Sequence, residues 1–130
     1  MTRGLLDTSV FIAREGRQLD IARLPDEVAV SVVTYAELRA GVLAASDLSV
    51  RSRRLTTLQT VADLNPLPID APVADAWAEL RLRLAESGRR MNVNDTWIAA
   101  TALAHDVPVV SQDADFDVLA DLGGFRVIHV

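Results

Sequence analysis

Five acidic residues carry the chemistry that this sequence could perform: Asp7, Glu37, Asp95, Asp113 and Asp115. Each lies near the end of a short apolar run or near the start of a helical stretch. The carboxyl ends of parallel strands meet at one edge of a sheet, so we expect these carboxylates to gather there. Carboxylates that close repel one another unless a cation neutralises them. Mg²⁺ and Mn²⁺ prefer such oxygen ligands, and the pattern therefore predicts a divalent metal site.

A metal held in this way can activate a bound water and stabilise charge on a phosphodiester, which is nuclease chemistry without His or Cys. Each acid taken alone also suits a structural role. Asp95 has the position of a helix cap, and Glu37 has capping-box spacing after Thr34. The joint placement of all five at one edge is what favours the metal site over capping.

The elements that must position these acids alternate along the chain, which indicates an α/β fold with a parallel sheet and helices on both faces. We expect one domain over residues 1–130, with the first strand central. Strands are expected over 3–7, 28–32, 67–69, 108–111 and 126–128. Helices are expected over 8–14, from Thr34 to about Ala45, from a cap at Asp47 to Asn65, from a cap at Asp70 to Gly88, from Asn94 or Asp95 onward, and over 114–120.

Local details refine this outline. Thr8 and Ser9 are expected to cap the helix that follows Asp7. Spacing gives the helix that follows Asp47 one apolar face, made of Leu48, Leu55, Leu58 and Ala62. Trp77 is expected in the core, and Trp97 in the core or at an interface.

Composition narrows the class of protein. The net charge of −5 argues against nucleic-acid binding over the whole surface, although it permits a local site. All 13 basic residues are Arg, the cation that binds phosphate in a bidentate manner. There is no cysteine, no apolar run of about 20 residues and no signal-peptide pattern, so we expect a cytoplasmic protein.

Four segments, taken in order, resemble the successive motifs of PIN-domain proteins, and most of all the VapC toxins of VapBC toxin–antitoxin pairs. They are Leu5–Val10, Thr34–Gly41, Asn94–Ala102 and Val110–Phe116. The resemblance implies a PIN-like fold and a Mg²⁺-dependent (or Mn²⁺-dependent) endoribonuclease. It also implies a VapB-type antitoxin as partner, RNA as substrate and a homodimer.

Carried over by position, Asp7, Glu37 and Asp95 match the first three acidic residues of the family. The fourth region departs from the family pattern, because many relatives place its acid further along, in a Thr-Arg-Asn type of segment. Here we favour Asp113 as the close ligand and Asp115 as a nearby or water-mediated one.

The remaining candidates surround this set. Thr8 and Ser111 are expected to orient carboxylates through their hydroxyls, and Asp117 to point away. Arg89 and Arg90, in the loop before Asp95, and Arg39 are candidate RNA contacts. Arg51, Arg53 and Arg54 suit a solvated helix face, and Tyr35, Leu38 and Val42 are expected to line a groove for the antitoxin helix.

Two other functions stay open at this point. The same metal site would suit a PIN nuclease that acts on DNA flaps or other phosphoesters, although the chain is short for threading a flap. A catalytically weak PIN module that only binds a partner is the non-enzymatic alternative. The sequence does not identify the target RNA.

Overall fold

A four-stranded, all-parallel sheet forms the centre of the computed structural model, which describes residues 1–16 and 18–130. The strand order is β2-β1-β3-β4, so β1 and β3 are the inner strands and the predicted central position of the first strand is confirmed. The strands are β1 (Arg3–Leu6), β2 (Glu27–Val30), β3 (Val109–Ser111) and β4 (Val127–His129).

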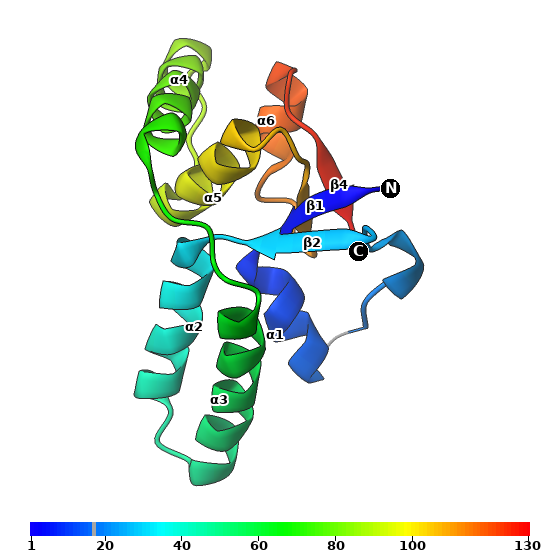
Figure 1. Ribbon diagram of the computed structural model, residues 1–130. Coiled ribbons are helices and arrows are strands. Elements are labelled where there is room, and N and C mark those ends of the chain that lie inside the picture. Colours follow the sequence, from blue (N-terminus) through cyan, green and yellow to red (C-terminus); the bar gives the residue numbers. More distant parts are fainter. Residues whose placement is uncertain (17) are drawn as a thin grey trace.

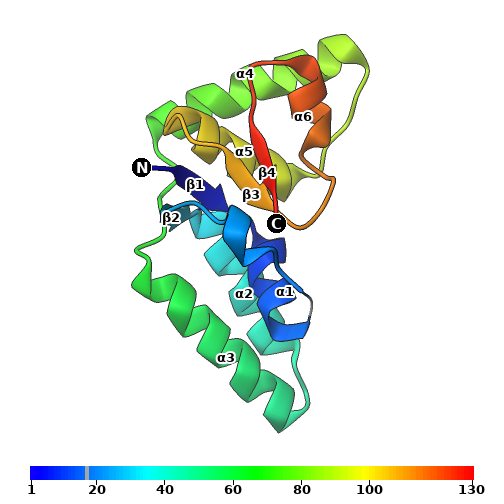
Figure 2. The same cartoon turned by 90° about the vertical axis from the view of Figure 1, so that its right-hand side faces the viewer.

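Helices cover both faces of this sheet, as expected (Figures 1 and 2). One face carries α1, α2 and α3, and the other carries α4, α5 and α6. A short 3₁₀ helix, η1, precedes β2. The bounds are α1 (Thr8–Gly16), η1 (Ile21–Arg23), α2 (Val32–Ala44), α3 (Leu48–Asp63), α4 (Ala71–Ser87), α5 (Val93–Ala104) and α6 (Asp117–Leu122).

Alternation along the inner strands creates two cores. Successive side chains of a strand point to opposite faces. Leu5 and Val109 therefore pack beneath α4, α5 and α6, whereas Leu6 and Val110 pack beneath α1, α2 and α3. Burial on both faces makes β1 and β3 the most enclosed strands, and fixes the edge at which they end.

The predicted strand over 67–69 is wrong. Leu67 forms one parallel bridge with Ser31 and nothing longer. Its N–H donates to Val30 O at 2.8 Å. Pro66 and Pro68 flank it and have no N–H to donate, so the ladder cannot extend in either direction.

Two helix starts also differ from the expectation. Ser31, which follows β2 directly, caps α2 by accepting a hydrogen bond from the Val33 N–H at 3.0 Å. Thr34 lies inside α2 and is fully buried, so it forms no capping box with Glu37. The cap of α5 is Asn92, two residues earlier than Asn94. The predicted caps Asp47 and Asp70 and the stop at Gly88 are confirmed.

Two predicted apolar faces were only partly right. Val42 is 1% exposed, so it cannot line an exposed groove, and Tyr35 is half-buried. Leu38 is buried to 9% exposure but does line a cavity, together with Gly41 and Arg54. Leu48 and Leu55 are 82% and 44% exposed instead of buried, because α3 packs mainly against α2 through Leu58 and Val61. None of the described helices is long and apolar enough to span a membrane.

Candidate active site at the carboxyl edge of the sheet

Asp7 follows directly after β1 and is only 4% exposed. Its N–H donates to Val110 O of the neighbouring strand at 3.0 Å. Its Oδ1 accepts hydrogen bonds from the Ser9 N–H (3.1 Å) and the Ser9 hydroxyl (2.5 Å), and its Oδ2 accepts one from Ser111 (3.0 Å). Asp7 itself therefore caps α1, which corrects the expectation that Thr8 and Ser9 do so.

Burial sets the charge behaviour of Asp7. The pKa of Asp7 is raised to about 6, mainly by the loss of solvent and in smaller part by the negative charge of Asp113. The hydroxyls of Ser9 and Ser111 oppose it by donating to the carboxylate. The charged form of Asp7 is therefore destabilised by burial, while its hydrogen bonds fix the position of the carboxylate.

The same two serines attach the loop after β3 to Asp7. The Ser9 hydroxyl accepts a hydrogen bond from the Gln112 N–H at 2.9 Å, and the Ser111 hydroxyl accepts one from the Asp113 N–H at 3.0 Å. Each hydroxyl thus donates to Asp7 and accepts from the loop. This arrangement positions Asp113 relative to Asp7.

Glu37 reaches the same edge from α2. The Thr8 hydroxyl lies 2.7 Å from Glu37 Oε1 and donates to it. Thr8 Oγ1 also lies 3.1 Å from the hydroxyl of Thr34, the buried residue that was misplaced as a cap. The start of α1 therefore fixes the carboxylate of α2.

Asp95 occupies the first turn of α5. The side chain of Asn92 accepts hydrogen bonds from the N–H groups of Asn94 (2.9 Å) and Asp95 (3.3 Å), which fixes this turn. The pKa of Asp95 is raised to about 7, first by burial and then by the carboxylates of Asp115, Asp7, Glu37 and Asp113, in that order. The other four acids are therefore within electrostatic reach of Asp95.

A cavity of about 250 Å³ contains this set, and we call it the acidic pocket. Asp117 is not among the residues that line it, and its Oδ1 lies 2.9 Å from His129 Nε2, within hydrogen-bond distance. Ser9, Asn92 and Ile12 line the pocket although only the acids and Thr8 were singled out for it. The lining consists of Asp7, Thr8, Ser9, Ile12, Glu37, Asn92, Asp95, Asp113 and Asp115.

The donor set of the acidic pocket suits a hydrated divalent cation. Within residues 1–16 and 18–130, no three His, Cys, Asp or Glu side chains converge closely enough to enclose a metal ion together. Mg²⁺ usually binds through one or two carboxylates and keeps several waters, for which the cavity has room. A positive charge there would also relieve the repulsion that raises the pKa of Asp95.

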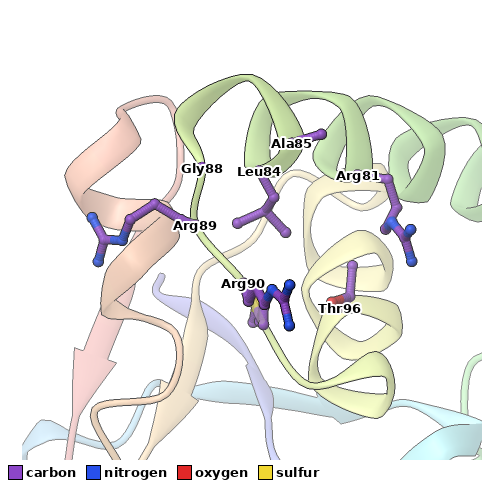
Figure 3. A pocket seen from close by; sticks show the side chains of 8 residues that line it. Arg81, Leu84, Ala85, Gly88, Arg89, Arg90 and Thr96 are labelled. Carbon is purple, nitrogen blue, oxygen red and sulfur yellow. The ribbon is translucent and has the colours of Figure 1, made fainter.

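The candidate RNA contacts lie outside the acidic pocket. Arg39 is exposed on α2 and does not line it. Arg89 and Arg90 line a different cavity, of about 460 Å³, together with Arg81 of α4 (Figure 3). Arg89 pairs with Asp121 at 3.7 Å.

Comparison with known proteins gives consistent results. The PIN domain family matches residues 4–122. Ribonuclease VapC5 from Mycobacterium tuberculosis is 56% identical over 98% of this chain and 95% of its own length, and Ribonuclease VapC4 is 46% identical over 92% and 93%. The fold resembles a chain in the crystal structure of VapBC-5 from M. tuberculosis, with a TM-score of 0.92, 52% identity and full coverage of both chains.

Proposed function

The chain belongs to the PIN-domain family, within its VapC-type ribonucleases, and from this membership we propose that residues 1–130 form one PIN domain that acts as the toxin of a toxin–antitoxin pair. The reaction is endonucleolytic hydrolysis of RNA. The observation that supports it most strongly is the meeting of five carboxylates in one pocket, with Asp7 anchored by three hydrogen bonds.

We assign the metal to this pocket, with Asp7, Glu37, Asp95, Asp113 and Asp115 as the residues that would hold it directly or through water. Mg²⁺ is the proposed ion, with Mn²⁺ as a substitute. When bound, it would supply Lewis acidity that lowers the pKa of a water and offsets charge on the phosphodiester.

The chain's own residues supply position. Ser9 and Ser111 hold the Asp7 carboxylate, and Thr8 holds that of Glu37, so the oxygen donors are in place before substrate arrives. In-line attack by water on phosphorus displaces the 3′ oxygen. The products would be a 5′-phosphate and a 3′-hydroxyl.

RNA cleavage tests this proposal. The wild-type chain should cut RNA with Mg²⁺ and lose that activity in EDTA, and Asp7→Asn and Asp95→Asn should each lower the rate at least about 100-fold. Asp75→Asn, an exposed carboxylate on α4, is the matched control and should match wild type. Full activity of both pocket variants would contradict the proposed mechanism.

We further propose that a VapB-type antitoxin inhibits the enzyme by covering the acidic pocket. Next to that pocket lies a cavity of about 280 Å³, which shares Thr8, Ile12 and Glu37 with it and extends to Gly41 and Arg54. Ile12 is 48% exposed there and offers an apolar contact. Of the three residues expected to form the groove, Leu38 lines this cavity, whereas Tyr35 and Val42 do not.

An Ile12→Ala variant tests the antitoxin surface, with the cleavage rate of each variant in the absence of antitoxin as its reference. It should be inhibited less by the cognate antitoxin, whereas Leu82→Ala, at an apolar residue of α4 that is 59% exposed, should remain inhibited. Equal inhibition of both variants would contradict the assignment. We also propose that the protein forms a homodimer and acts in the cytoplasm, where RNA is accessible.

A further inference from the structure

The cavity between α4 and α5 has the opposite charge to the acidic pocket. Three arginines, Arg81, Arg89 and Arg90, line it and no carboxylate does, so we call it the arginine cavity. Both cavities are lined by residues at the start of α5. Asn92 and Asp95 line the acidic pocket, whereas their neighbours Met91 and Thr96 line the arginine cavity.

Two of the three cations are available to a ligand. In Figure 3 the guanidinium groups of Arg81 and Arg90 lie on either side of Thr96, whereas that of Arg89 points away. Arg89 is paired with Asp121 at 3.7 Å. Within residues 1–16 and 18–130, neither Arg81 nor Arg90 forms an ion pair.

Arg81 is also held in place. Its guanidinium carbon lies 5.1 Å from the centre of the Trp77 ring, and Trp77 stacks on Trp97 of α5 with the ring centres 4.7 Å apart. A guanidinium over an aromatic face is attracted to it without losing its hydrogen-bond donors. The cation is thus fixed while its donors stay free for an anion.

We propose that the arginine cavity binds a backbone phosphate of the RNA strand whose scissile bond lies in the acidic pocket. This inference rests on the proposed ribonuclease function and adds how the strand is held. A chain of net charge −5 with five carboxylates at its active site repels RNA, so a strand must gain attraction nearby. Arg81 and Arg90 supply two phosphate-binding forks beside the same turn of α5 that carries Asp95.

RNA binding measured without cleavage tests the role of Arg81 and Arg90. In an Asp95→Asn background, a short single-stranded RNA is titrated at several salt concentrations. Arg81→Gln and Arg90→Gln should each weaken binding about 3- to 10-fold and reduce the slope of log affinity against log salt by roughly 0.7 per lost contact. Arg53→Gln, an exposed arginine on α3, is the control and should change neither quantity.

Kinetics in the otherwise wild-type chain provide a second measurement. Both cavity variants should raise KM for RNA by a similar factor and leave kcat within about twofold, because the arginines touch substrate away from the cut bond. Arg90→Gln removes no packing partner of Trp77, so it tests the proposal even if Arg81→Gln lowers stability.

Three results would overturn the inference. These are a salt slope unchanged from that of Arg53→Gln, no RNA binding by the Asp95→Asn background, or a change in oligomeric mass in place of a change in RNA affinity. If Asp95→Asn and Asp7→Asn both cleave RNA at the wild-type rate, the metal–carboxylate mechanism fails instead, and affinities measured in EDTA still decide the role of the arginines.

Discussion

The hydroxyl of Ser111 donates a hydrogen bond of 3.0 Å to Asp7 Oδ2, joining the end of β3 to the end of β1 across 104 residues of chain. The same hydroxyl accepts a hydrogen bond from the Asp113 N–H at 3.0 Å. One buried side chain therefore sets the spacing between two carboxylates of the acidic pocket. Neither carboxylate is positioned by its own strand or loop alone.

Removing this hydroxyl should be costly. Ser111→Ala leaves a buried carboxylate with one donor fewer and should lower the free energy of unfolding by about 1–3 kcal/mol. Ser49→Ala, at an exposed position on α3, should stay within about 0.5 kcal/mol of wild type. Urea denaturation measures both, and equal stability of the two variants would show that the hydroxyl is not structural.

In the metal-free protein, the ionisation of Asp7 should make the free energy of unfolding depend on pH. Its pKa is raised from 3.8 to about 6, so the folded state binds this proton more tightly than the unfolded state. The associated stability is full below pH 3.8 and is lost as pH rises through about 6, a change of about 3 kcal/mol. Asp7→Asn should therefore gain that much relative to wild type between pH 4 and pH 7 in EDTA.

Urea denaturation at each pH gives this difference, with Asp75→Asn as the control at an exposed carboxylate. A constant difference between Asp7→Asn and wild type over that range would mean that Asp7 is not desolvated as described.

The hydrogen bond from Thr8 to Glu37 should matter for metal affinity more than for folding. Thr8→Val keeps the shape of the side chain and removes the donor that lies 2.7 Å from Glu37. We expect the Mg²⁺ concentration for half-maximal cleavage to rise about 10-fold, and Thr8→Ser to restore it. Thr56→Val on α3 is the control, and an unchanged Mg²⁺ requirement in Thr8→Val would exclude a positioning role.

Asp113 and Asp115 act on different carboxylates of the acidic pocket. Asp113 is the carboxylate that raises the pKa of Asp7, whereas Asp115 is the one that acts most strongly on Asp95. Asn substitutions at both should lower RNA cleavage by about 10-fold or more. Asp117→Asn should not, because Asp117 pairs with His129. Cleavage at the wild-type rate by Asp113→Asn and by Asp115→Asn would show that this loop is not part of the active site.

Much of this site could be predicted because strand ends are easy to locate. The run Leu5-Leu6 before Asp7 and the run Val109-Val110 before Ser111 are buried strands, and parallel strands bring their ends to one edge. Given the fold, the acids after them had to meet. Glu37 was expected at the same edge because its helix follows the second strand, and the family motifs added its match to the second acidic residue of the family.

The failures have a physical pattern as well. Ser31 and Thr34 are both residue types that commonly cap a helix. Ser31 caps α2 because β2 ends at Val30, directly before it. Val42 was expected at a surface because helical spacing identifies a face but not what covers it, and it is buried. The arginine cavity combines Arg81 of α4 with a loop that follows it, a proximity that only the packing of α4 on α5 creates.

Direct measurement of metal binding tests the central claim, that the acidic pocket is a divalent metal site. Calorimetric titration of the chain with Mn²⁺ should show binding that Asp75→Asn preserves. Asp7→Asn and Asp95→Asn should each weaken it at least 10-fold, since each removes a charge that the cation neutralises. Undiminished Mn²⁺ affinity in both pocket variants would contradict the account.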